Sequence, residues 1–266
     1  MIDRIRTIVD KEWAEVFKNR MVLVTIGIMP VIFTVLMLGV LYGITATGGE
    51  AMAEAASADV PPQFLSMCTD MNSVECMQIF MMNQFMIMFM MMPLAIPVAI
   101  AAYSIVGEKT TRSLEPLLAT PVTTVELLTG KALASALPAI VVTWICFLVF
   151  ILLLPLVGAT PGLMAYISGP LWLVAILVMG PLMAVASVNL AVIVSSRVND
   201  PRVAEQMAGV LIVPLLGILF GQLAGVIVLD LNLMFISLLV LLLFDIVLIY
   251  IGARLFQRET ILTRWK

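Results

Sequence analysis

Six long apolar runs constrain this chain more than any other feature of its sequence. Each holds roughly the 20 apolar residues that a helix needs to cross a hydrocarbon core of about 30 Å. Lipid offers no hydrogen-bond partners to an open backbone, and the runs lack the alternation of barrel strands, so we expect helices. The sequence therefore predicts an all-α membrane protein with six transmembrane helices. The runs cover residues 21–43, 80–106, 132–156, 171–195, 207–229 and 233–253.

The basic residues set the expected orientation of these spans. All 14 Lys and Arg residues lie before the first run, between the second and third, between the fourth and fifth, or after the sixth. Positively charged segments stay in the cytoplasm, so we expect both termini on the cytoplasmic side. Residues 44–79 then form the largest outer loop.

We expect an arm at residues 1–20, followed by a six-span domain at residues 21–266. The spacing of the apolar residues of the arm predicts an amphipathic helix that lies in the membrane interface, with its charges on the opposite face. We expect no cleaved signal, because the first apolar run is too long and its leader carries acids. The predicted apolar face of the arm consists of Ile2, Ile5, Val9, Trp13 and Val16.

Several kinds of chemistry are missing from the sequence. The chain has no histidine, which excludes Ser-His-Asp catalysis and His-based zinc sites. Gly130-Lys131 is followed by Ala132, so this pair does not belong to a phosphate-binding P-loop. Lys and Arg do not cluster beyond the membrane flanks, so we expect no nucleic-acid partner. We predict no catalytic, cofactor or metal site, which leaves transport or membrane anchoring.

Residues 107–131, GEKTTRSLEPLLATPVTTVELLTGK, are a polar segment between two apolar runs. The leucine spacing in the first half predicts a short amphipathic helix that continues the second span. Thr120-Pro121 should break this helix. Thr123 and Glu126 then form a capping box that starts the third span. The pattern predicts a helix, a sharp elbow and a capped helix on the cytoplasmic side; a connecting loop on the membrane surface is the alternative.

This segment resembles the signature of ABC-2 type transporter permeases, in which a Glu is followed by a pattern written tLepLLatPvs…ell.GK. Arg112-Ser113 replaces the common Gly before the Thr-Leu pair of that pattern. The resemblance extends to the whole plan of a basic arm, six spans and a larger first outer loop. The residues in register are Leu114-Glu115, Leu117-Leu118, Thr120-Pro121, Glu126-Leu127-Leu128 and Gly130-Lys131.

The resemblance implies a permease subunit of an ATP-binding cassette exporter in the cell membrane of a prokaryote. Its implied partners are a separate ATPase subunit, a second permease subunit in a homodimer or heterodimer, and membrane lipid. The segment 107–131 would dock on the ATPase, and Glu108 would hold it to a cationic group on the arm or the adjacent subunit. The implied coupling residues are Glu108, Arg112, Leu114, Glu115, Leu118, Pro121, Thr123, Glu126 and Lys131.

The spans contain few charges, which favours a lipid-like or amphiphilic substrate. Asn189 and Asp245 lie within spans, where polar groups are costly. We expect them to pair as a clamp, or Asp245 to form an ion site. If Asp245 carries an ion, the protein is instead an ion-coupled secondary transporter. A non-transporting membrane anchor or sensor is the third alternative.

Small residues and prolines mark the spans. Gly217, Gly221 and Gly225 recur at i+4 steps in the fifth span, which predicts close helix packing either within one subunit or at a dimer seam. Prolines inside spans should kink their helices, whereas Pro138 lies near the start of the third span and bends it at most. The expected kinks lie at Pro93, Pro97, Pro181 and Pro214.

Sulfur-containing residues gather at the start of the second span. Ten of the 20 Met residues fall between Met67 and Met92, which suits core packing, an adaptable apolar binding surface, or Cu(I) together with cysteines. Cys68 and Cys76 share the outer loop, and a disulfide between them is possible there. Cys146 lies within a span, where we expect it to pack as an apolar residue.

Overall fold

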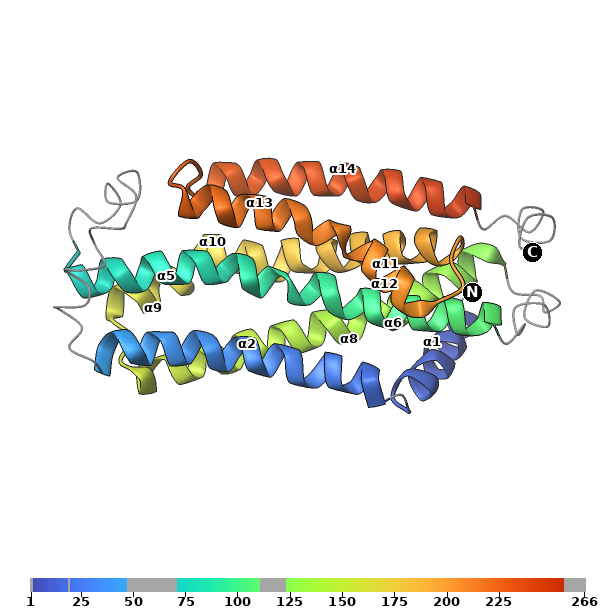
Figure 1. Ribbon diagram of the computed structural model, residues 1–266, viewed down its shortest axis with the longest axis horizontal. Helices are drawn as coiled ribbons and strands as arrows, with labels where there is room; N and C mark the ends of the chain where they lie inside the picture. Colours follow the sequence, from blue (N-terminus) through green and yellow to red (C-terminus); the bar gives the residue numbers. More distant parts are fainter. Residues whose placement is uncertain (1, 19, 47–70, 111–122, 256–266) are drawn as a thin grey trace.

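The computed structural model describes residues 2–18, 20–46, 71–110 and 123–255. Throughout these ranges the chain is built from helices (Figure 1). Six of the helical stretches are long and apolar enough to cross a membrane, which confirms the predicted number of spans. They cover Val22–Ala46, Ser73–Gly107, Val125–Val157, Pro161–Ser195, Pro201–Leu223 and Leu231–Leu255.

Most spans consist of more than one helical element. The elements in chain order are α1 (Ile2–Val16), α2 (Arg20–Ala46), α5 (Ser73–Met90), α6 (Met92–Thr110), α8 (Thr124–Leu153), η2 (Leu154–Val157), α9 (Pro161–Ile167), α10 (Pro170–Val174), η3 (Ala175–Met179), α11 (Gly180–Ser195), α12 (Pro201–Ala208), η4 (Gly209–Leu211), α13 (Ile212–Leu223) and α14 (Leu231–Leu255).

The second span begins earlier than its apolar run predicts. The Asn72 side chain caps α5 by accepting a 2.8 Å hydrogen bond from the Glu75 backbone N–H. Packing against the rest of the bundle holds the first turns of α5, where Gln78 and Ile79 are both buried. Gln78 is polar, so the apolar run did not include this part of the helix. The helix therefore includes the last part of the segment 44–79, which was predicted as an outer loop.

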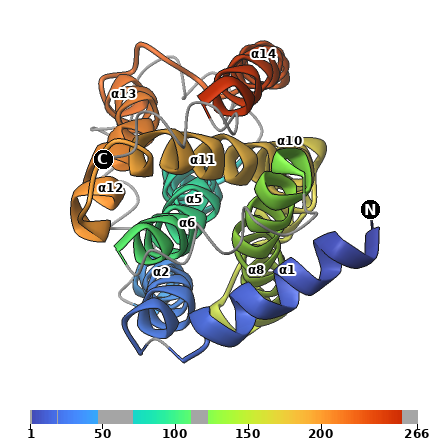
Figure 2. The same ribbon diagram turned by 90° about the vertical axis from the view of Figure 1, so that its right-hand side faces the viewer.

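The second and fourth spans form the centre of the bundle. In their most apolar windows 83% and 61% of the residues are buried, against 17–33% in the other four spans. The view along the bundle shows α5 and α6 surrounded by α2, α8, α11 and α13 (Figure 2). α14 packs mainly on α11 at the margin. A movement of the second span would therefore reach most of the other helices directly.

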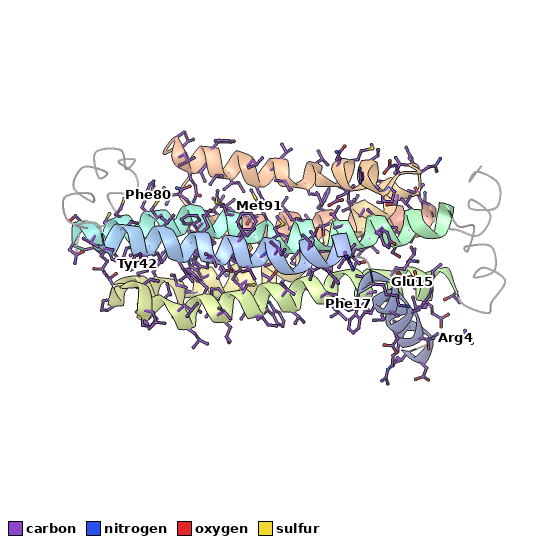
Figure 3. The ribbon with its side chains drawn as sticks, turned by 60° about the horizontal axis from the view of Figure 1, so that its bottom comes forward. Arg4, Glu15, Phe17, Tyr42, Phe80 and Met91 are labelled. Carbon is purple, nitrogen blue, oxygen red and sulfur yellow. The ribbon has the colours of Figure 1, made fainter. Side chains whose placement is uncertain are left out.

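Three of the predicted kinks coincide with local breaks in helical geometry. The second span breaks at Met91, two residues before Pro93, near the middle of the bundle (Figures 1 and 3). A π-helical turn, η3, precedes Pro181, and a 3₁₀ turn, η4, precedes Pro214. Such breaks arise where proline removes a backbone donor and crowds the preceding turn. Pro138 lies within the uninterrupted α8.

The core in the half of the bundle away from α1 is aromatic and rich in methionine. Trp172 of α10 is fully buried and stacks on Phe147 and Phe150 of α8, with ring centroids 5.9 Å and 6.3 Å apart. Phe89 of α5 meets Phe147 edge to face at 6.1 Å. The same core contains several of the clustered methionines, which supports the packing interpretation for them. The fully buried ones are Met82, Met86 and Met92.

A single buried glutamine organises the turn between the third and fourth spans. Gln78 Nε2 donates to the Gly158 carbonyl at 3.3 Å, and Gln78 Oε1 accepts from the backbone N–H and the hydroxyl of Thr160 at 3.1 Å and 2.9 Å. Gly158 has a positive φ of 78°, which favours glycine. Both ends of the Gln78 amide are thus used to hold this turn on α5.

We predict that Gln78→Leu destabilises the protein. The substitution leaves the Gly158 carbonyl and the Thr160 N–H without their partner, and an unsatisfied buried group costs about 1–3 kcal/mol. The unfolding temperature of the purified protein in detergent measures the effect. Gln84→Leu is the matched control, because the Gln84 Oε1 in the same helix has no hydrogen-bond partner among the residues that the structure describes. Equal unfolding temperatures for the two variants would contradict the role of Gln78.

Candidate functional site

The described segments that carry Lys and Arg gather at one end of the bundle, which we call the basic end. It contains α1, the last turns of α6, the first turns of α8 and the last turn of α14 (Figure 1). The segment 107–131 connects α6 to α8 at this end. The basic end is therefore the place where the predicted coupling segment meets the rest of the fold. Which side of the membrane it faces stays a prediction.

A buried polar cluster joins three elements at the basic end. Lys131 Nζ of α8 lies 2.8 Å from Glu12 Oε1 of α1 and donates at 2.8 Å to Ser104 Oγ of α6. The Ser104 hydroxyl donates in turn to Glu12 Oε2. The exposed fractions are only 2% for Glu12, 5% for Lys131 and 6% for Ser104. Every partner lies on a different helix, so the cluster ties the arm to the second and third spans.

The cluster holds Glu12 in its charged form. Burial alone would raise the pKa of the Glu12 carboxyl. The charge of Lys131 and the hydrogen bonds from Lys131 and Ser104 outweigh this effect and keep the pKa below its ordinary value of 4.5. Lys11 adds a further positive charge 3.7 Å from Glu12 Oε1 and also pairs with Glu15, which is labelled on α1 in Figure 3.

Apolar contacts bring the arm close to the start of α8. Gly130 lies directly against Ile8, since a Cβ added at Gly130 would come within 2.9 Å of two Ile8 carbons. One turn further along, the Trp13 indole Nε1 donates to the Ala134 carbonyl at 3.0 Å. Val16 is almost fully buried. Gly130 thus permits the close approach of α1 to α8, and the ion pair between Lys131 and Glu12 then joins the two helices.

The docked face of α1 differs from the predicted apolar face. Its buried residues are Ile8, Val9, Glu12 and Val16, whereas Ile2 is 80% exposed. The packing on α8 rotates the helix so that Glu12 points inward to reach Lys131. Whether the opposite face lies in the membrane interface stays a prediction.

The predicted capping box at the start of the third span is confirmed. The Glu126 backbone N–H donates to Thr123 Oγ1 at 3.2 Å, and Glu126 Oε2 accepts from the Thr123 backbone N–H at 2.9 Å. Arg4 of the arm lies 3.5 Å from the same Glu126 oxygen and thereby adds a second ionic link between α1 and α8. The cap and the buried cluster therefore hold the same helix end from two sides.

The other predicted coupling residues fall outside the part of the chain that the structure describes. Arg112, Leu114, Glu115, Leu118 and Pro121 lie outside the described residues, as does the side chain of Glu108. The structure describes two ionic links between the arm and the segment 107–131. In one, Arg4 of the arm pairs with the acid Glu126, which is the direction expected for Glu108. In the other, which is buried, Glu12 of the arm pairs with the cation Lys131.

Sequence reasoning missed Glu12, Ser104 and Ile8 as members of this site. Glu12 stood among the charges of an amphipathic helix, where acids are normally solvated. A usable signal was its position four residues after Ile8 and four before Val16, which places it on one helical face with two apolar residues. Ser104 gave no such signal, because small polar residues are common in spans.

The two predicted intramembrane polar residues do not pair. Asn189 Nδ2 donates to the Val185 carbonyl of its own helix at 2.9 Å. Asp245 is buried in α14, and neither of its carboxylate oxygens has a hydrogen-bond partner among the residues that the structure describes. The clamp expected between them is therefore not formed. The spans also contain polar residues that the sequence analysis overlooked, namely Gln78, Asn83, Gln84 and Gln222.

Two of the three glycines of the fifth span serve the turn that follows it. Gly225 has a φ of 70° and donates its N–H to the Gln222 carbonyl at 2.9 Å, while Val226 N–H reaches the Gly221 carbonyl at 2.9 Å. This pattern ends α13 in a Schellman motif. Ile227 then folds back over Gly221. A Cβ added at Gly217 would meet no atom within 4 Å, and the dimer seam stays a prediction.

The cysteine residues are described only in part. Cys76 is buried in α5 and takes part in a disulfide bond. Cys146 is a free thiol. Cys68 lies outside the described residues, so its pairing with Cys76 stays a prediction.

Comparison with known proteins adds one finding. Residues 6–250 match the family model described as ABC-2 family transporter protein. The match runs from within α1 to near the end of α14 and so includes the basic end. No curated protein matches the chain.

We predict that removing one member of the buried ion pair is more harmful than removing both. Lys131→Met leaves the Glu12 charge buried without its main partner, and breaking such a pair costs about 3–5 kcal/mol. The double substitution Glu12→Leu with Lys131→Met should recover much of this loss, because no isolated charge remains buried. Thermal unfolding of Glu12→Leu, Lys131→Met and the double variant gives the coupling free energy between the two sites.

Arg6→Met provides the control for this experiment. It removes an exposed i,i+4 pair with Asp10 on the same helix, and we expect an unchanged unfolding temperature. Additive effects of the two single substitutions at Glu12 and Lys131 would show that the pair does not hold the arm.

We also predict a specific acid dependence of arm docking. The pKa of Glu12 is lowered in the folded protein, so the stabilisation it provides is fully present above its ordinary value of 4.5. The stabilisation is lost as the pH falls through the lowered pKa. The difference in unfolding temperature between the parent protein and Glu12→Gln should therefore stay constant from neutral pH down to the ordinary pKa of 4.5. It should shrink only below that pH. A difference that already shrinks near neutral pH would contradict this assignment.

Proposed function

Because this chain belongs to the ABC-2 transporter family, we propose that it is the permease subunit of an ATP-driven exporter. The match confirms the family that residues 108–131 suggested, and six apolar helices agree with a multi-pass membrane protein. In this proposal a separate ATPase subunit hydrolyses ATP and a second permease subunit completes the path. The exported substrate is lipid-like or amphiphilic, and the complex works in the cell membrane of a prokaryote.

The observation that carries the proposal is the buried Glu12–Lys131–Ser104 cluster. A soluble subunit that pushes on the segment 107–131 must move the helices on either side of it. A loose segment would absorb the push, whereas a segment held at its end transmits it. The cluster and the Thr123 cap supply such a hold at the start of α8.

The cluster also gives a route from the basic end to the centre of the bundle. Lys131 moves with α8, Ser104 moves with α6, and Glu12 makes the arm follow both. α6 continues into α5 through the break at Met91, and this second span is the most buried of the six. In the proposed mechanism, ATP binding closes the ATPase, shifts the segment 107–131 and thereby tilts the second span against its neighbours.

One observation favours a second function. Asp245 is 4% exposed within a span, and its carboxylate has no hydrogen-bond partner among the described residues. Buried intramembrane carboxylates often carry protons or cations. As an ion-coupled secondary transporter, the protein would transport without ATP and stop when the ion gradient is collapsed. A non-transporting anchor would tolerate loss of the segment 107–131.

We predict that the double substitution Thr123→Ala with Glu126→Ala weakens association with the ATPase while the protein still inserts into the membrane. It removes the three hydrogen bonds between Thr123 and Glu126 and the ionic link to Arg4, so the end of the coupling segment loses its fixed position. The measurement is co-purification of a co-expressed P-loop ATPase encoded beside this chain, together with the membrane yield of the permease.

The matched control is Asn72→Ala, which removes the N-cap of α5 at the opposite end of the bundle. It should lower stability to a similar degree and leave co-purification of the ATPase intact. If both sets of substitutions reduce co-purification equally, stability rather than docking explains the effect. If the ATPase binds neither the parent chain nor its variants, the proposed partnership is wrong.

A further inference from the structure

We propose that Asp245 is a proton-binding site in the contact between α14 and α11, and that its proton is released when α14 moves away from α11. The inference goes beyond the proposed function, because it involves neither the ATPase nor the substrate. It also differs from the second candidate function, in which an ion bound at Asp245 drives transport.

Asp245 lies on the packed face of α14. In the second half of this helix the buried residues are Asp245, Leu248 and Gly252, which recur at steps of three and four and so share one face. α14 packs mainly on α11 (Figure 2). Asp245 is only 4% exposed and lies about 15 Å along the helix from its end at Leu255. The carboxyl group is therefore covered by protein well inside the span.

The neighbouring helix α11 gives this carboxyl group no hydrogen bond. Its polar side chains are Ser187, Asn189 and Ser195. Ser187 and Asn189 each donate to a backbone carbonyl of α11 itself at 2.9 Å. Ser195 Oγ and both carboxylate oxygens of Asp245 have no hydrogen-bond partner among the residues that the structure describes.

The helices around α14 also bring no opposite charge to Asp245. α11, α10 and α13 contain no titratable side chain. In α8 the charged residues Glu126 and Lys131 both pair with the arm, which lies across the bundle from α14 (Figure 2). The remaining titratable group of α8 is the thiol of Cys146, which contacts Thr34 of α2.

Within α14 the other titratable groups are Tyr250 and Arg254. Both are exposed, and the Arg254 guanidinium carbon lies 4.6 Å from the centroid of the Tyr250 ring. The cation of this helix is thus stacked on an exposed ring, whereas Asp245 is buried. Asp245 therefore has no counter-ion on its own helix or on the helices packed against it.

Such surroundings suit a proton and no metal ion. A buried carboxylate without a partner is far more costly than the neutral acid, so such a group takes up a proton. A metal ion needs several oxygen ligands, and the described residues contain no group of three or more acids, cysteines or histidines that could hold one. A proton needs only one of the two oxygens of Asp245.

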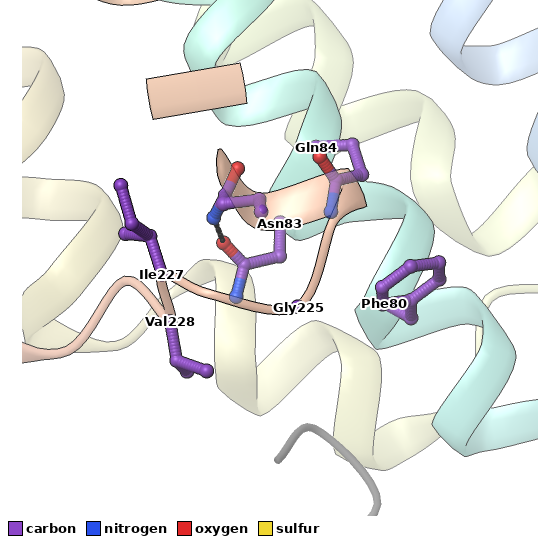
Figure 4. A pocket seen from close by; sticks show the side chains of 7 residues that line it. Phe80, Asn83, Gln84, Gly225, Ile227 and Val228 are labelled. Carbon is purple, nitrogen blue, oxygen red and sulfur yellow. Dashed lines mark hydrogen bonds between the residues drawn. The ribbon is translucent and has the colours of Figure 1, made fainter. Parts of the chain in front are cut away.

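Buried amides elsewhere in the spans show the contrast. Gln222 Nε2 of α13 donates to Asn83 Oδ1 of α5 at 2.8 Å, as the dashed line in Figure 4 shows. An amide side chain is neutral at any ordinary pH, so this contact does not depend on a proton. Asp245 differs because its charge changes when it gains or loses one.

Movement of α14 changes the balance between the two forms of Asp245. When α14 leaves α11, water reaches the carboxyl group and solvates its ionised form, and the proton passes to that water. Proton binding therefore favours the packed position of α14, as any ligand favours the state that binds it more tightly. Only 17% of the most apolar window of this span is buried, so few other contacts oppose the movement.

Infrared spectroscopy of the full chain in lipid nanodiscs tests whether the proton is present. At neutral pH the parent protein should show a carboxylic-acid C=O band that is lost in Asp245→Asn and in Asp245→Leu. Asp230→Asn is the matched control and should keep the band. Asp230 is an exposed acid at the start of the same helix, and its oxygen accepts from the Leu233 N–H at 2.8 Å, which an Asn oxygen also does. Loss of a carboxylate band instead of an acid band would show that Asp245 is ionised and would overturn the proposal.

Hydrogen exchange of α14 tests whether proton release is linked to packing. The parent and Asp245→Asn, or Asp245→Leu if the first variant does not fold, are compared at each pH, which cancels the intrinsic pH dependence of exchange. We expect the ratio of the exchange rates, parent over variant, to rise with pH by at most about tenfold per pH unit, because opening releases one proton. A constant ratio at every pH would show that packing does not depend on the proton, which also overturns the proposal.

The site and the proposed function fail separately. Neither measurement uses ATP or an ATPase subunit. Absence of the acid band leaves the proposed partnership with an ATPase intact, whereas absence of the ATPase in co-purification leaves the proton site intact.

Discussion

The demand that each polar group removed from water must find a partner within the protein governs this structure. In the spans the backbone meets the demand by forming helices, because lipid supplies no hydrogen bonds. Side chains have no such general solution, and each polar one needs a specific neighbour. Lys131 meets Glu12 and Ser104, and Gln78 meets Gly158 and Thr160. These polar contacts thus add specific links between helices to the apolar packing of the core.

The arm illustrates how one such contact changes the role of an element. By composition α1 is a charged helix with one apolar face, which suits a membrane surface. Glu12 turns this helix towards α8, where Gly130 allows it to approach Ile8 closely. Replacing a buried ion pair by apolar residues is often neutral for stability, so stability alone does not explain why a chain would keep one here. A fixed connection between the arm and the segment that would receive the ATPase gives the pair a purpose.

The features that could be predicted from the sequence are those that depend on residues close to one another in the chain. The six spans follow from apolar length, the capping box from Thr123 and Glu126, and the breaks before Pro93, Pro181 and Pro214 from the chemistry of proline. The second span was predicted too short because Gln78 reads as a loop residue until its partners at Gly158 and Thr160 are known. The same limit applies to Glu12, whose partner lies more than a hundred residues away. Asn189 and Asp245 were expected to pair because both are polar and lie at similar depth, but Asn189 is satisfied by its own helix.

The two ends of the second span are held by different polar contacts. At the basic end Ser104 belongs to a cluster in which Lys131 and Glu12 are close partners, so this end resists deformation. Towards the other end, beyond the break at Met91, Asn83 accepts a hydrogen bond from Gln222 of α13, and Gln78 holds the turn at Gly158. A movement that begins at the basic end can therefore reach the fifth span through the central second span. The proposed division of labour needs such a connection, because a push received at one end of the bundle does no work on the other end unless the helices between them move together.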